Sequence, residues 1–170
     1  HARRRLRFWT LPRWVLSPLV LLTTFSWVRY QPKGVVLILA PWNYPFMLSI
    51  SPLVSAIAAG NNVVLKPSEY CPTVNAIILQ MIKDVFPRGE VLLKQGGAEI
   101  SKKLIKEKAI SHIFFTGSPE VGTQVAKAAA ENLVPVTLEL GGKNPVIVAK
   151  GADLKSFVPK LVWGKFLNNG

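Results

Sequence analysis

Two side chains of this sequence carry groups that could act on a carbonyl compound. Glu139 closes the apolar run 134–140 and stands before the glycine pair 141–142. A carboxylate there is expected to be partly desolvated, which suits a general base, although a structural carboxylate that accepts turn amides fits the same pattern. Asn43 lies in the proline-rich loop 41–45. Its amide could donate to a developing oxyanion, or it could simply form a turn.

A second set of residues could bind a phosphorylated sugar. Ser118 follows Gly117 between an expected strand and an expected helix, where a hydroxyl and the helix-end amides attract an anion. The spacing approaches a Walker loop, but Thr123 stands where that loop needs lysine, so nucleotide triphosphate hydrolysis is not supported. A plain helix N-cap is the alternative for Ser118. Lys66 and Glu69 could pair with the hydroxyls of a ribose, or with each other at the surface.

Composition excludes several other kinds of site. The chain has one cysteine and two histidines, which excludes an internal disulfide framework and a cysteine-built zinc site. We expect no metal. Cys71 begins an expected helix and is interpreted as a packing or surface residue. His112 lies in an expected strand and is interpreted as a satisfied histidine of the core or of a sheet edge.

The elements that must position these residues alternate along the chain. From residue 34 onward, short β-branched runs alternate with helical patterns, which predicts an α/β fold with a doubly wound parallel sheet. Such sheets bind ligands at the carboxyl ends of their strands, so we expect Asn43, Glu139 and the ribose and phosphate contacts around a single cleft. Before the sheet, residues 19–30 are predicted to form an antiparallel hairpin with its turn near 23–24. The predicted strands are 35–39, 62–65, 91–93, 111–115, 134–140 and 145–149, and the predicted helices are 46–59, 72–86, 98–108, 118–132 and 154–167.

The positive charge is concentrated at the N-terminus. Lysine and arginine total 21 against 9 acidic residues, for a net charge of +12, and residues 1–33 hold seven of the basic residues and no acidic one. Binding to nucleic acid or to an anionic membrane is one interpretation. A solvated surface segment is the favoured one, so we expect no nucleic-acid partner.

Two stretches mimic membrane-directed segments. Residues 1–28 resemble a secretory signal, but Pro18 interrupts them and no small-residue cleavage site follows. The uncharged run 34–65 is long enough to span a bilayer, but prolines and asparagines interrupt it. A buried strand followed by a buried helix is therefore predicted. We expect no membrane contact from this segment and a cytoplasmic location.

Four motifs occur in order and at matching spacing: 41–45, 66–69, 115–122 and 138–143. Together they resemble the aldehyde dehydrogenase superfamily, most closely its class 3 or fatty-aldehyde branch. The likeness runs from about residue 18 to residue 170 and covers a middle portion of the family's chain. It implies a Rossmann-like cofactor domain at 34–140, the beginning of a catalytic domain at 141–170, and an oligomerisation-type segment with a hairpin at 1–33.

The resemblance also implies roles for individual residues. Asn43 matches the oxyanion-stabilising asparagine and Glu139 the general base. The implied cofactor is NAD, with NADP as the alternative, and the implied reaction oxidises an aldehyde to a carboxylic acid through a cysteine thiohemiacetal and a thioester. The implied cofactor contacts are Trp42, Lys66, Ser68, Glu69, Gly97, Gly117, Ser118, Val121, Leu140 and Gly141.

One departure from the family pattern concerns the nucleophile. The family's cysteine lies in a Gly-Gln-x-Cys motif that would begin at Gly170, and Cys71 does not match it. We therefore expect the 170 residues as given to be inactive, and the full-length enzyme to be a homodimer with a small-molecule aldehyde as its substrate. The alternative is a non-catalytic module for nucleotide binding or dimerisation.

Overall fold

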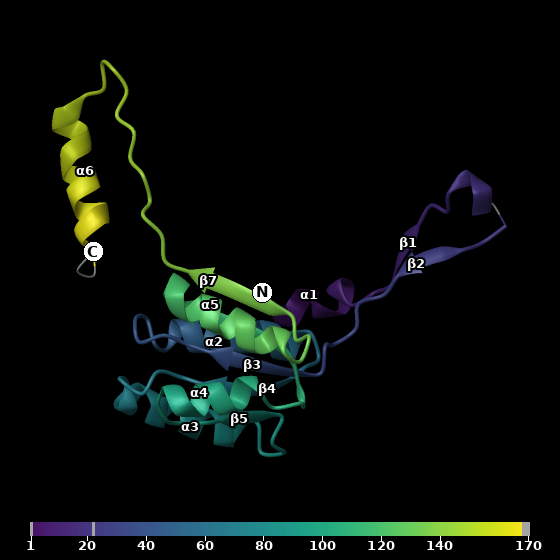
Figure 1. Ribbon diagram of the computed structural model, residues 1–170. Coiled ribbons are helices and arrows are strands. Elements are labelled where there is room, and N and C mark those ends of the chain that lie inside the picture. Colours follow the sequence, from purple (N-terminus) through teal and green to yellow (C-terminus); the bar gives the residue numbers. More distant parts are fainter. Residues whose placement is uncertain (1, 22, 168–170) are drawn as a thin grey trace.

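The computed structural model describes residues 2–21 and 23–167, and its centre is a five-stranded parallel sheet (Figure 1). The strands lie in the order β5-β4-β3-β6-β7. After β3 the chain adds β4 and then β5 on one side of it, and then returns to add β6 and β7 on the other side. This is the strand order of a mononucleotide-binding half. The strands are β3 (Val35–Leu39), β4 (Asn62–Lys66), β5 (Val91–Leu93), β6 (Ile110–Gly117) and β7 (Val136–Leu140).

Helices cover both faces of this sheet because successive residues of a buried strand point to opposite sides. Val36 and Ile38 of β3 pack in one core cluster with residues of α2 and α3, whereas Leu37 and Leu39 pack with residues of α4 and α5 in another. The predicted doubly wound sheet is therefore confirmed. The helices are α2 (Met47–Ala58), α3 (Pro72–Val85), α4 (Ala98–Ile105), α5 (Pro119–Ala130) and, beyond the sheet, α6 (Leu154–Phe166).

The uncharged run 34–65 lies in β3, α2 and β4. Strand β3 is buried as predicted, but only Ser49 and Leu53 of α2 are buried, so the predicted buried helix is corrected to a helix with one face on the sheet. The side chain of Asn61, just before β4, links the start of β3 to the end of α2 by hydrogen bonds. Its Oδ1 accepts from the backbone N–H groups of Lys33 (2.6 Å) and Gly34 (3.0 Å), and its Nδ2 donates to the carbonyl of Ala56 (3.0 Å). Across residues 2–21 and 23–167, no helix is both long enough and apolar enough to cross a bilayer.

The N-terminal hairpin exists, but its strands differ from the prediction. Helix α1 (Ala2–Trp9) comes first, and β1 (Arg13–Val15) then pairs with β2 (Ser26–Val28). Residues 19–21, predicted to open the hairpin, form the 3-10 turn η1 (Leu19–Leu21) instead. The ring of Trp14 meets Phe25 and Trp27 edge to face, at centroid distances of 6.3 and 5.8 Å. These aromatic contacts stabilise the pairing of 13–15 with 26–28, in place of the hairpin predicted within 19–30.

The predicted strand at 145–149 is wrong. These residues have no strand partner among the described part of the chain, and Ile147 is 92% exposed. A β-branched run becomes a strand only when another strand satisfies its backbone groups. Figure 1 shows the chain leaving the sheet after β7 and running to α6, none of whose residues is buried.

Candidate active site

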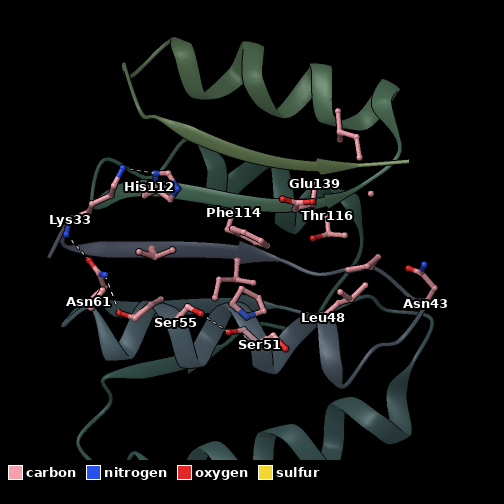
Figure 2. Close-up of a pocket in the computed structure, with 18 of the residues that line it drawn as sticks. Lys33, Asn43, Leu48, Ser51, Ser55, Asn61, His112, Phe114, Thr116 and Glu139 are labelled. Carbon is pink, nitrogen blue, oxygen red and sulfur yellow. Dashed lines mark hydrogen bonds between the residues drawn. The ribbon is translucent and has the colours of Figure 1, made fainter. Parts of the chain in front are cut away.

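Two clefts open at the carboxyl edge of the sheet, one on each face. The α2-side cleft, of about 1030 Å³, lies between α2 and strands β3, β6 and β7. Asn43 and Glu139 both line it. Figure 2 shows these two residues and Thr116 toward one end of the cleft, with Lys33 and His112 at the other end.

The α4/α5-side cleft, of about 620 Å³, lies on the opposite face of the sheet. Lys66, Ser68, Glu69 and Val121 line it. Gly97 is not among its lining residues, but a Cβ placed on Gly97 would lie 3.5 Å from Oε1 of Glu69. The expected cofactor contacts from β4 and α5 are thus brought together.

The two clefts meet along a shared rim. Pro41, Trp42, Thr116, Gly117 and Ser118 line both of them. The rim follows β3 and β6, the neighbours between which the strand order reverses, and this is where such sheets bind ligands. The single cleft predicted from the sequence is therefore corrected to two adjoining clefts, because the sheet itself separates its two faces.

Lys66 and Glu69 form an ion pair in the α4/α5-side cleft. Nζ of Lys66 lies 2.8 Å from Oε2 of Glu69, and the side chains are 7% and 36% exposed. The hydrogen bond from Lys66 is the largest of the effects that hold the pKa of Glu69 below its ordinary value. The two side chains thus pair with each other, as the alternative interpretation predicted, with the ammonium buried and the exposed carboxylate lining the cleft.

Ser118 occupies the N-cap of α5, as the plainer interpretation predicted. Its Oγ accepts from the backbone N–H of Val121 at 3.3 Å. The carboxylate of Glu120 also lies in this first turn, and hydrogen bonds to its own backbone N–H and to Ser118 lower its pKa. The turn therefore favours negative charge, which is the property needed for a phosphate.

Glu139 is exposed, which corrects the expected partial desolvation. It lies on β7, the edge strand of the sheet, where it pairs with Thr116 of β6. This carboxylate would be buried only if another element packed over the end of β7. In the described part of the chain, Glu139 is left exposed there.

The loop that carries Asn43 is held by its neighbours. Tyr44 has a φ of 47°, in the left-handed region that a residue with a side chain rarely adopts. Its carbonyl accepts from the N–H of Leu48 at 2.9 Å, and the thiol of Cys71 donates to the carbonyl of Trp42 at 3.4 Å. Strained backbone of this kind persists only where the surroundings hold it, so the direction of the exposed Asn43 is set by this turn.

Sequence reasoning missed Thr116 and the polar end of the α2-side cleft. His112 accepts or donates at both ring nitrogens: Nδ1 lies 3.2 Å from Nζ of Lys33, and Nε2 lies 3.0 Å from Oγ1 of Thr137. Burial, and secondarily the charge of Lys33, lower the pKa of His112. The satisfied histidine predicted from the sequence is confirmed. The pairing of Lys33 with a residue so distant in sequence had no local signal.

The groups around the two clefts suit a dinucleotide. In the described ranges, no group of three or more His, Cys, Asp or Glu side chains is placed to hold a metal ion. The two adjoining clefts offer the Lys66–Glu69 charged pair, the N-terminus of α5 and a shared rim that includes Gly117. Such a path suits an extended ligand with a ribose and a phosphate.

Comparison with protein families decides the classification. Residues 17–170 match the model of the aldehyde dehydrogenase family. The chain belongs to this family. The resemblance inferred from the four motifs is thereby confirmed, including its class 3 character, since family 3 members are among the relatives.

The chain spans about a third of the length of the aldehyde dehydrogenases it matches. It is 46% identical to a 4,4'-diaponeurosporen-aldehyde dehydrogenase of Staphylococcus aureus, over 99% of this chain and 37% of that protein. Identity to aldehyde dehydrogenase family 3 member A2 of Macaca fascicularis is 43%, over 94% and 34%.

Solved aldehyde dehydrogenase structures share the fold. The substrate-bound state of Staphylococcus aureus AldH superposes with a TM-score of 0.92 at 46% identity, covering 98% of this chain and 36% of that one. The NAD+ complex of an aldehyde dehydrogenase from Bacillus cereus gives 0.85 at 30% identity, covering 98% and 34%. The Rossmann-like cofactor domain is thus established for this chain.

Proposed function

We propose that this chain is the cofactor-binding part of an NAD(P)+-dependent aldehyde dehydrogenase, an oxidoreductase that converts an aldehyde into a carboxylic acid. One observation carries the proposal. Asn43 and Glu139 line a cleft whose rim is shared with the cleft that holds the Lys66–Glu69 pair. The reacting groups and the dinucleotide contacts therefore adjoin at one edge of the sheet.

In this proposal the dinucleotide follows the two clefts from one face to the other. Lys66 and Glu69 contact the hydroxyls of the adenosine ribose, and Ser118 with the α5 amides receives the pyrophosphate. Leu140 and Gly141 border the nicotinamide. Because Glu69 is ionised and would repel a 2′-phosphate, NAD is favoured over NADP.

Asn43 and Glu139 act on the aldehyde carbon in this proposal. The amide of Asn43 donates to the oxygen that becomes negative when a thiolate adds to the aldehyde. The bound cofactor supplies the hydride acceptor. In the second half-reaction, Glu139 takes a proton from water, the water oxygen bonds to the thioester carbon, and the thiolate leaves.

The nucleophile of this reaction is not Cys71. Its thiol donates to the carbonyl of Trp42, and Cys71 lines neither of the two clefts described above. We therefore propose that the 170 residues as given oxidise no aldehyde, and that they provide nucleotide binding to a longer enzyme. A non-catalytic module for nucleotide binding or dimerisation remains the second candidate, which the same cofactor cleft and the exposed hairpin favour.

The hairpin is proposed to contact a second copy of the longer protein in a homodimer. Trp14, Phe25 and Trp27 are all exposed on it, and it projects from the sheet (Figure 1). Exposed aromatic groups of this kind are typical of interfaces. Light scattering of the longer protein should show a dimer that becomes a monomer when Trp14 and Trp27 are both changed to serine. A Trp14→Ser, Trp27→Ser protein that stays dimeric would assign the interface elsewhere.

The remaining assignments stay predictions. The division into 1–33, 34–140 and 141–170 is supported by β7 ending at Leu140 and by the exposed path that follows it. The small-molecule aldehyde substrate is supported by the family, and the cytoplasmic location is a prediction from the sequence.

The proposed function is tested by calorimetric titration of the purified chain with NAD+. Binding is expected, with Glu69→Ala weakening it, while Asp84→Ala, which removes an exposed carboxylate of α3 that lines neither cleft, leaves it unchanged. Mixing the chain with NAD+ and an aldehyde should produce no NADH fluorescence. Absence of NAD+ binding would refute the cofactor role, and aldehyde-dependent NADH would refute the proposed inactivity.

A further inference from the structure

The end of strand β7 is held against helix α5 by a contact that only glycine permits. A Cβ placed on Gly122 would lie 2.6 Å from Cδ2 of Leu140 and 3.5 Å from Cε1 of Phe115. Real Cβ atoms essentially never come as close as 2.6 Å to another heavy atom. Leu140 therefore occupies a hollow that any side chain at position 122 would fill.

A second glycine contributes to the same junction. The N–H of Gly141 donates to the carbonyl of Gly117 at 3.3 Å. A Cβ placed on Gly117 would lie 2.5 Å from Cζ of Phe115, so the buried Phe115 ring packs against both glycine positions. The side chain of Leu140 and the backbone of Gly141 are thus fixed on β6 and α5 together.

This junction also sets the direction of the neighbouring carboxylate. Successive side chains of a strand point to opposite faces. Because Leu140 is seated on α5, Glu139 is directed to the other face, where it lines the α2-side cleft with Asn43. Leu140 is 43% exposed and is also among the residues that line this cleft. A shift of the β7 end would therefore move both the wall of the cleft and the carboxylate.

We propose that Gly122 is a positioning residue: by leaving room for Leu140, it places the β7 end against which the nicotinamide of the dinucleotide lies. This inference rests on the proposed function, since it assigns a dinucleotide to the two clefts. Gly122 itself touches no ligand in this scheme. Its effect passes through Leu140, and it should concern the nicotinamide end of the ligand and not the adenosine end at Lys66 and Glu69.

Two ligands separate these ends. NAD+ and ADP-ribose share the adenosine and the pyrophosphate, but only NAD+ carries nicotinamide. Titration of the purified chain with each ligand gives the ratio of the two dissociation constants. Because overpacking by a single methyl group displaces its neighbours, Gly122→Ala should weaken NAD+ binding about fivefold or more relative to ADP-ribose binding.

The control is the same substitution where there is space. Gly164→Ala also adds a methyl group inside a helix, and a Cβ at position 164 meets nothing within 4 Å. Both substitutions favour helix formation, so only the contact with Leu140 distinguishes them. Gly164→Ala should leave the binding of both ligands unchanged.

A double variant tests whether the effect passes through Leu140. Leu140→Val lacks both Cδ atoms, so adding Gly122→Ala to it should no longer change the ratio of dissociation constants. Urea unfolding without ligand should agree: Gly122→Ala should destabilise the wild-type chain but cost little in the Leu140→Val background. If Gly122→Ala alone does not fold, the double variant must still fold and bind.

The outcomes separate the inference from the function on which it rests. Wild-type protein that binds neither ligand refutes the proposed function. If the wild type binds both, the inference is overturned when Gly122→Ala weakens both equally or neither, or when Leu140→Val fails to remove the effect. Selective loss of NAD+ binding that Leu140→Val abolishes supports it.

Discussion

The Lys66–Glu69 pair offers the sharpest test because its two partners are buried to different depths. The side chain of Lys66 is 7% exposed and that of Glu69 is 36% exposed. Glu69→Ala leaves a buried ammonium without its partner. Breaking a fully buried pair costs about 3–5 kcal/mol, and because water reaches this carboxylate we expect a lower value, about 2 kcal/mol. Lys66→Met leaves only a carboxylate that water can hydrate, so about 1 kcal/mol or less is expected.

The free energy of unfolding is measured by urea denaturation near pH 7 and physiological salt. A matched control is the exposed Lys102–Glu99 pair, which has the same sequence separation and the same 2.8 Å distance. Lys102→Met and Glu99→Ala should leave stability unchanged within error. Equal losses for Lys66→Met and Glu69→Ala, or a larger loss for Lys66→Met, would refute the argument from unequal burial.

The pH dependence supplies an independent check on the same pair. The pKa of Glu69 is lowered in the folded protein from an ordinary value of 4.5. The pair's contribution is therefore complete above pH 4.5 and is lost as the pH falls through the lowered pKa. The stability difference between wild type and Lys66→Met should be constant from pH 7 to 5 and should shrink below that.

Three further predictions concern the core, the histidine and the helix cap. Leu37→Ala, at a fully buried position of β3, should cost about 2–5 kcal/mol in urea unfolding, whereas Leu133→Ala, at an exposed position, should cost nothing measurable. The pKa of His112 is lowered from 6.5 in the folded protein. The neutral ring's contribution to the free energy of unfolding is therefore complete above pH 6.5, and it is lost as the pH falls through the lowered pKa. Wild-type protein should accordingly lose more stability between pH 7 and 5 than His112→Asn, and equal losses would contradict the burial of the ring. Ser118→Ala should cost about 1 kcal/mol as a lost N-cap. Ser118→Asp should keep the cap but weaken NAD+ binding by repelling the pyrophosphate, and unchanged titration would remove Ser118 from the proposed phosphate contacts.

The core strands and the helices between them could be predicted because their signals are local. The run from Val35 to Leu39 is apolar on both faces, and Pro72 and Ser118 mark helix starts by their own backbone and side-chain chemistry. The family followed from motifs at the strand ends, because the backbone and side chains needed there restrict which residues can occupy each position.

Strand pairing, exposure and side-chain contacts that depend on residues distant in sequence could not be predicted from such local signals. The run 145–149 has strong strand propensity but no strand beside it, and Glu139 has an apolar neighbourhood in sequence but an open edge in space. The pairing of Lys33 with His112 joins residues far apart in the chain.

The amino-acid sequence by itself determined where the strands and helices of the parallel sheet form and which side chains follow each of those strands, because propensity, capping and apolar patterning act within a few residues. Only the tertiary structure decided that Asn43 and Glu139 share a cleft on one face while Lys66 and Glu69 lie on the other, and that Leu140 packs on Gly122. The order in which strands associate sets these relations, and that order results from packing among segments that no local pattern connects.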